Sequence, residues 1–196
     1  MRKAIFLDRD GTINEEVNYL KHPGEIRIFP NTVKALHTFK SLGFLNIIIT
    51  NQSGIARGFI SENDLDKIHN EFRRLLIFDG KELIDFIYFS PYHPDGIIKK
   101  FACNNPDRKP GTGMIEKASE KFQLNLSESF LIGDSYTDIK CAANAGIKSI
   151  LVKTGYGTRD EKICLEENLK PGYVADDLYD ASEFVKKIVL KEINVI

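Results

Sequence analysis

The stretch Phe6-Leu7-Asp8-Arg9-Asp10-Gly11-Thr12 follows directly on an apolar run that starts at Lys3. A short apolar run of this kind is typical of a buried strand in a parallel sheet. The strand ends at two aspartates one residue apart, and Gly11-Thr12 then supplies a turn signal. Because open α/β sheets bind ligands beyond the carboxyl ends of their strands, we expect Asp8 and Asp10 at the mouth of a site. The alternative interpretation is an ordinary Asp-Gly turn after a strand.

Strands and helices alternate along the rest of the chain. We predict caps for two helices, Asn31 for the first and Ser61 with Asp64 for the second, and we expect Gly43 and Gly146 to end helices. Further strands are predicted over 44–49, 83–89, 130–132, 148–152 and 173–174, and helices over 31–42, 61–76, 114–122, 138–145 and from 178. The alternation predicts one α/β domain over residues 1–196, a doubly wound parallel sheet in three α/β/α layers.

Polar side chains end three of these strands. Thr50, beside Asn51, brings a hydroxyl and nearby backbone N–H groups that suit an anionic oxygen, although a turn explains the same pair. Asp134, and Asp138 four residues later, stand where a strand becomes a helix. Since parallel strands end at one edge of a sheet, we expect Asp8, Thr50 and Asp134 to converge. Two carboxylates that close repel each other, and a shared divalent cation relieves the repulsion.

Arg108-Lys109-Pro110 leads into the helix that starts near residue 114. A lysine at the start of a helix is unfavourable for the helix dipole unless an anion lies there, so we predict an anion site at Lys109. A solvated basic pair is the alternative interpretation.

Composition excludes several other classes of function. The 196 residues are 42% hydrophobic and 28% charged, with a net charge of −1 and no basic block, so nucleic acid is not an expected partner. Three cysteines spaced far apart predict a reducing compartment rather than a disulfide framework. The first apolar run is too short for a signal peptide or a membrane span. We therefore expect a cytoplasmic protein, and the polar loops favour a monomer.

The ordered set Asp-x-Asp-Gly-Thr, Thr, Lys and Gly-Asp-x-x-x-Asp resembles the haloacid dehalogenase superfamily of aspartate-nucleophile phosphohydrolases, over roughly the first four-fifths of the chain. The resemblance implies a Mg²⁺-dependent phosphatase. Asp8 is then the nucleophile and a metal ligand, and Asp10 is the acid/base whose carbonyl also binds the metal. The remaining implied roles are phosphoryl binding for Thr50 and Lys109, metal binding for Asp134, and support behind the metal for Asp138.

Longer matches at residues 6–14, 50–58 and 108–110 resemble the D-glycero-D-manno-heptose 1,7-bisphosphate phosphatases, with the histidinol-phosphate phosphatases as close relatives. The continuation Ser53-Gly54-Ile55-Ala56-Arg57-Gly58 favours the heptose branch. A bisphosphate brings a second anion, which Arg108 could bind through two hydrogen bonds. Arg9 and Arg57 stay unassigned, with surface charge as the default interpretation. The substrate contacts that the resemblance implies are Glu16, Val17, Asn18, Tyr19, Asn51, Gln52, Ser53 and Arg108, and we add Ser135.

The segments between the motifs are too short for an inserted cap domain, so we expect a capless core closed by the loops 13–27 and 90–107. The leading prediction is a sugar-bisphosphate phosphatase, and the alternative enzyme is a histidinol-phosphate phosphatase. A phosphosugar-binding protein without catalysis is the third hypothesis. The acid/base Asp10 disfavours it, because a binding module has no need of that group.

Many relatives in this family carry a structural zinc in the loop before the Arg-Lys-Pro motif, held by a Cys-Pro-His segment and a later Cys-x-Cys. Here Ser90 and Tyr92 stand in the first segment, and Asn105 and Asp107 replace the later pair. His93 and Cys103 remain nearby but are out of register. Since a structural zinc site needs four ligands, usually thiolate and imidazole, we predict that this loop binds no zinc.

Overall fold

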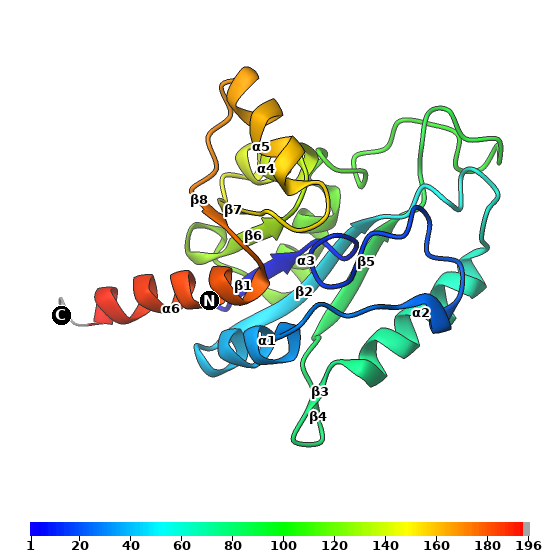
Figure 1. Ribbon diagram of the computed structural model, residues 1–196. Coiled ribbons are helices and arrows are strands. Elements are labelled where there is room, and N and C mark those ends of the chain that lie inside the picture. Colours follow the sequence, from blue (N-terminus) through cyan, green and yellow to red (C-terminus); the bar gives the residue numbers. More distant parts are fainter. Residues whose placement is uncertain (194–196) are drawn as a thin grey trace.

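Six parallel strands form the sheet of the computed structural model, which describes residues 1–193 (Figure 1). Residues 194–196 of the predicted domain lie outside the described residues. The strand order is β5-β2-β1-β6-β7-β8, with β1 near the middle. The bounds are β1 Lys3–Leu7, β2 Phe44–Asn51, β5 Phe86–Ser90, β6 Phe130–Gly133, β7 Lys148–Val152 and β8 Tyr173–Ala175. The predicted doubly wound α/β fold is confirmed.

Helices cover both faces of the sheet, because the inner strands are apolar on both sides. In β1, Ile5 and Leu7 pack with side chains of the helices on one face, whereas Ala4 and Phe6 pack with those on the other. The first face carries α1 (Thr32–Ser41), α2 (Glu62–Leu75) and α6 (Leu178–Ile193). The second carries α3 (Gly113–Phe122) and α4 (Tyr136–Ala145), with α5 (Gly157–Glu166) packed against α4 and β7.

A small antiparallel hairpin, which the sequence interpretation missed, follows α2. It joins β3 (Ile77–Phe78) to β4 (Lys81–Glu82) through Asp79 and Gly80, whose φ angles of +48° and +71° suit a tight two-residue turn. The predicted strand over 83–89 is therefore wrong at its start, and β5 pairs with β2 only from Phe86. The hairpin precedes β5, so it lies at the amino end of that strand, away from the predicted site (Figure 1).

The predicted helix ends are confirmed with one exception. Ser61 and Asp64 form a reciprocal capping box on α2, and Gly43 and Gly146 take positive φ where α1 and α4 end. Asn31 does not cap α1 with its side chain: its φ of +61° places it in the left-handed region, and no side-chain cap hydrogen bond forms. That prediction was wrong because the turn before α1 uses Asn31 for its backbone conformation.

Loops that follow β1, β2 and β5 lie together on one side of the molecule (Figure 1). The loop after β1 has a single 3-10 turn, η1 (Pro23–Glu25), and Ile13, Leu20 and Ile26 anchor it in the core. A second 3-10 turn, η2 (Leu126–Glu128), precedes β6. Among the described helices, none is both long and apolar enough to cross a membrane.

Candidate active site

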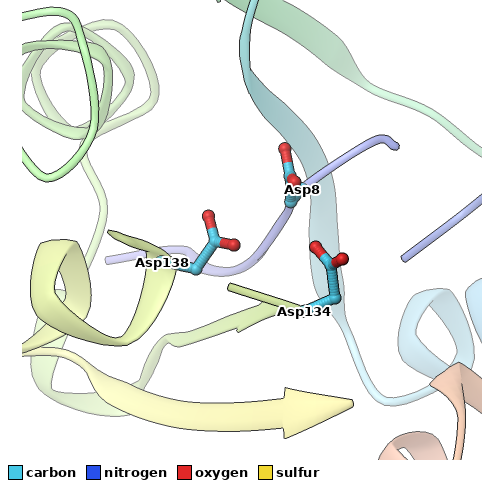
Figure 2. A group of neighbouring side chains, drawn as sticks. All are labelled: Asp8, Asp134 and Asp138. Carbon is cyan, nitrogen blue, oxygen red and sulfur yellow. The ribbon is translucent and has the colours of Figure 1, made fainter. Parts of the chain in front are cut away.

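Three strand ends bring the predicted carboxylates together. Asp8 follows β1 and donates its backbone N–H to the Ile132 carbonyl of β6 at 2.9 Å, which ties the two strand ends to each other. Asp134 follows β6, and Asp138 lies in the first turn of α4. One carboxylate oxygen of each of these three residues lies within 4.8 Å of those of the other two (Figure 2). The convergence expected from the parallel sheet is present.

Lys109 lies between two of these carboxylates. Its Nζ is 2.7 Å from Asp8 Oδ1 and 2.6 Å from Asp138 Oδ1, and the side chain is almost fully buried. Burial disfavours the ammonium, but Asp138 and Asp8 outweigh it and raise the pKa of Lys109 above its ordinary value. The lysine is therefore a fixed cation at neutral pH, as an anion-binding group must be.

Asn51 fixes the backbone of Lys109 from the opposite strand end. The Lys109 N–H donates to Asn51 Oδ1 at 3.0 Å, and Asn51 Nδ2 donates to the Lys109 carbonyl at 3.1 Å. This reciprocal pair joins the end of β2 to the Arg-Lys-Pro segment, which otherwise belongs to a long irregular loop. Asn51, predicted as a substrate contact, thus uses its amide to position Lys109.

The three aspartates form a site suited to a hard divalent cation. Burial raises the pKa of Asp8 to about 7 despite the nearby Lys109, and burial together with the Asp8 charge raises the pKa of Asp134 to about 9. One lysine does not neutralise three closely spaced carboxylates, and oxygen ligands are the type that Mg²⁺ prefers. The donor set therefore fits the cation that the sequence predicts.

Close backbone packing fixes the direction of the Asp134 carboxylate. The Tyr156 N–H donates to Asp134 Oδ2 at 2.7 Å. A Cβ at either Gly11 or Gly155 would lie 2.1 Å from the same oxygen, and both glycines have positive φ. Only glycine lets these two turns approach the carboxylate so closely.

Asp10 accepts four hydrogen bonds. Oδ1 accepts from Arg9 Nε at 3.1 Å and Asn14 Nδ2 at 3.0 Å, and Oδ2 accepts from Arg9 Nη2 at 2.7 Å and Gln52 Nε2 at 3.0 Å. Burial opposes the charged form, but Arg9 and these hydrogen bonds outweigh it and lower the pKa of Asp10. In this arrangement Asp10 is a carboxylate, the form that can take up a proton.

Two adjoining hollows meet at Asp10. The first, the carboxylate hollow, has a volume of about 190 Å³ and is lined by Asp8, Thr50, Lys109, Asp134, Ser135 and Thr137. The second, the loop hollow, has about 210 Å³ and contains Asn18, Tyr19, Leu20, Gln52, Ser53 and Gly54. Asp10, Glu16, Asn51 and Tyr156 line both. The first hollow thus offers one cationic side chain among carboxylates, and it opens into a second hollow lined mainly by polar groups.

Two predicted substrate contacts lie outside these hollows. The Val17 side chain is exposed and faces a different surface depression beside Lys21 and Arg27. Arg108 is half-buried, donates through Nη1 to the Tyr92 carbonyl at 3.1 Å and borders a neighbouring hollow with His93. Ser135 does line the carboxylate hollow, and its hydroxyl and backbone N–H both donate to Asp138 Oδ2, at 2.5 and 3.1 Å.

The sequence interpretation missed several residues at the site, Leu20 and Gly54 in the loop hollow among them. Tyr156 and Thr137 line the carboxylate hollow, and Arg9, left as surface charge, is fully buried behind Asp10. For Tyr156 a signal was present: the Thr154-Gly155-Tyr156-Gly157 turn follows the buried strand β7 and reaches the same sheet edge. Arg9 offered no such signal, because its burial depends on side chains of the distant helix α2.

Comparisons with known proteins agree with this geometry. A HAD-hydrolase-like family model matches residues 107–181. The chain is 35% identical over 187 residues to D-glycero-D-manno-heptose-1,7-bisphosphate 7-phosphatase of Thermosynechococcus vestitus, covering 94% of this chain and 95% of that protein. It is 40% identical over 170 residues to the D-glycero-alpha-D-manno-heptose-1,7-bisphosphate 7-phosphatase of Photorhabdus laumondii, covering 85% and 92%.

A solved structure is similar over nearly the whole chain. The D,D-heptose 1,7-bisphosphate phosphatase from B. bronchiseptica, complexed with magnesium and phosphate, superimposes with a TM-score of 0.83 at 30% identity, covering 95% of this chain and 99% of that one. With relatives above 30% identity over almost their full length, the chain belongs to the heptose-bisphosphate phosphatase family of the haloacid dehalogenase superfamily.

Proposed function

We propose that this protein is a Mg²⁺-dependent phosphatase that removes the 7-phosphate of D-glycero-D-manno-heptose 1,7-bisphosphate. The observation that carries the proposal is the position of Lys109 between Asp8 and Asp138, with Asp10 directly beside the same hollow. An anionic nucleophile approaching an anionic phosphate needs a fixed positive charge. A second carboxyl group next to it is the other requirement of a two-step hydrolysis.

The reaction has two steps. Before the first step Asp10 takes up a proton from solvent water. In that step, a carboxylate oxygen of Asp8 forms a bond to phosphorus, the bond from phosphorus to the sugar oxygen breaks, and protonated Asp10 gives its proton to that leaving oxygen. In the second, Asp10 takes a proton from water as the water oxygen attacks phosphorus, and the bond to Asp8 breaks to release inorganic phosphate. Thr50 and Lys109 hold the phosphoryl oxygens in both steps.

The hydrogen bonds of Asp10 indicate where its proton moves. Arg9 and Asn14 are fully buried, whereas Gln52 lines the loop hollow. Gln52 Nε2 donates to both Asp10 Oδ2 and Thr50 Oγ1, at 3.0 and 2.8 Å. Of the three donors to Asp10, Gln52 is therefore the one that a leaving oxygen or an attacking water displaces. Proton transfer at Oδ2 leaves the contacts of Oδ1 in place.

Mg²⁺ would be held by the side chains of Asp8 and Asp134 and by the Asp10 carbonyl, with Asp138 behind them. When bound, it neutralises charge on the phosphoryl oxygens and on Asp8. Two observations support this assignment: the close spacing of the three carboxylates, and the raised pKa values of Asp8 and Asp134.

The rest of the substrate extends into the loop hollow. Glu16, Asn18 and Ser53 offer hydrogen-bonding groups of the kind that sugar hydroxyls need. A second phosphate at the far end of the sugar is an anion, and Arg108 is the planar cation that suits it. Histidinol phosphate carries an amine at the equivalent end, but Arg108 by itself does not separate the two substrates, because the two groups of relatives share it.

The loop over 90–107 is proposed to hold its shape without zinc. The His93 ring lies 3.2 Å from Arg57 Nη2, and Cys103 is exposed. Asn105 accepts from the Asp107 N–H at 2.9 Å, and Asp107 forms an ion pair with Lys117 at 2.5 Å. Asn105 and Asp107, at two of the positions where relatives place zinc ligands, are thus engaged in a turn-forming hydrogen bond and an ion pair.

Turnover of two substrates tests the proposal. The purified protein with Mg²⁺ is given heptose 1,7-bisphosphate or histidinol phosphate, and Asp8→Asn serves as the matched control for contaminating phosphatase. We expect kcat/KM to favour the bisphosphate by about 100-fold or more, since a buried charged contact contributes several kcal/mol. Equal turnover, or a preference for histidinol phosphate, contradicts the substrate assignment. Activity that survives in Asp8→Asn contradicts the site.

A further inference from the structure

Arg9 connects the proposed acid/base to helix α2. Two of its guanidinium nitrogens, Nε and Nη2, form the fork on Asp10. The third, Nη1, lies 3.3 Å from Nε2 of His69, a buried side chain of α2. The guanidinium carbon lies 5.3 Å from the ring centroid of Phe72, one turn further along the helix. All three nitrogens of Arg9 therefore have a partner, and α2 supplies the contacts on the far side.

The contact between Arg9 and His69 has one direction. A guanidinium has no acceptor, so His69 Nε2 must accept and the ring proton must be on Nδ1. Burial, with the Arg9 charge beside it, lowers the pKa of His69 to about 3, so the ring is neutral in the working range of pH. Phe89 packs against the ring at a centroid distance of 5.8 Å. His69 is held as a neutral, fixed acceptor in an apolar setting.

We propose that His69 is a positioning residue for catalysis: it fixes Arg9, and through Arg9 the direction in which Asp10 presents Oδ2 to the site. The inference rests on the acid/base role proposed for Asp10. An arginine side chain has several rotatable bonds, and a fork on one carboxylate leaves the pair free to pivot together. The third hydrogen bond, to a helix that belongs to the core, removes that freedom. Misplacement of a catalytic group by about 1 Å costs up to about 100-fold in rate.

This role predicts a signature that depends on the leaving group. An alkoxide leaves slowly unless Asp10 gives it a proton, whereas nitrophenolate is a stable anion that leaves without one. Loss of positioning at Asp10 therefore lowers kcat/KM for a sugar phosphate much more than for p-nitrophenyl phosphate. A general loosening of the fold lowers both alike.

The experiment compares three variants with the wild-type protein on heptose 1,7-bisphosphate and on p-nitrophenyl phosphate. His69→Leu removes the acceptor, and His69→Gln offers an amide oxygen where Nε2 lies. Ile68→Val, the neighbouring core position on the same helix, is the control for loosened packing. We expect His69→Leu to lose about 10- to 100-fold in kcat/KM on the sugar phosphate and less than about 3-fold on the nitrophenyl ester, with His69→Gln recovering most of the loss. Ile68→Val should change kcat/KM by the same factor on both substrates.

Asp10→Asn, measured in parallel by the rate of leaving-group release in a single turnover, separates this inference from the proposed function. If Asp10→Asn lacks the leaving-group signature, the acid/base role itself is refuted and the inference falls with it. If Asp10→Asn has the signature and His69→Leu affects both substrates equally, the acid/base role stands and positioning by His69 is refuted. Failure of His69→Gln to recover activity when His69→Leu has the signature also counts against the hydrogen bond as the cause.

Discussion

Acidification should destabilise this protein through His69. Its pKa is about 3 in the folded protein, against an ordinary value of 6.5. Below pH 6.5 the unfolded chain takes up a proton at His69 that the folded protein does not, so stability is lost as pH falls from 6.5 towards 3. A pH of about 5 lies about 1.5 units below the ordinary pKa of histidine. Each unit lowers the free energy of unfolding by about 1.4 kcal/mol, so the loss at that pH is about 2 kcal/mol.

The free energy of unfolding in urea, measured at about pH 7 and about pH 5 with a chelator present, tests this magnitude. His69→Gln has no proton to gain, so the loss between the two pH values should be about 2 kcal/mol smaller in the variant than in the wild type. Ile68→Val keeps His69 and should lose as much as the wild type. If the wild type and His69→Gln lose the same free energy of unfolding between the two pH values, His69 protonates as readily in the folded protein as in the unfolded chain, and its burial has no such effect.

Three further outcomes are expected. Asp8→Asn and Asp10→Asn should each reduce turnover of a sugar phosphate by at least about 100-fold, because the first removes the nucleophile and the second removes proton transfer. Near-normal activity of Asp10→Asn would exclude Asp10 as the acid/base. Turnover should require Mg²⁺ and disappear with a chelator, and full activity after exhaustive metal removal would contradict the proposed mechanism. Elemental analysis of protein purified without chelator should find no zinc, whereas one tightly held zinc per chain would show that Cys103 and His93 have found other partners.

The core of the site could be predicted because topology determines it. Apolar strands that alternate with helices form a parallel sheet, and residues that directly follow the strands must then meet at one edge. Asp8, Thr50 and Asp134 needed no further information. Lys109 was predictable only as an anion site, since its contact with Asp8 comes from a loop and depends on the Asn51 pair.

The environment of Asp10 could not be predicted from the sequence. Arg9 stands between two aspartates, and such a residue is normally exposed. Its burial follows from His69 and Phe72, which lie about sixty positions away and come into contact only when α2 packs on the sheet. The hairpin at 77–82 was missed for a different reason: the Asp79-Gly80 turn signal was present, but its two strands are only two residues long.

A burst experiment on Asp10→Asn tests the central claim, that Asp8 forms an aspartyl phosphate which Asp10 then helps to hydrolyse. Nitrophenolate leaves p-nitrophenyl phosphate without a proton, so this variant, with Mg²⁺, should complete the first step and stall at the second. We expect release of one equivalent of nitrophenolate per chain, a gain of one phosphoryl group in the intact mass, and its location on the peptide that contains Asp8. The double variant Asp8→Asn, Asp10→Asn should show neither. The absence of a burst and a mass gain in Asp10→Asn, or a phosphoryl group on another residue, would contradict the account.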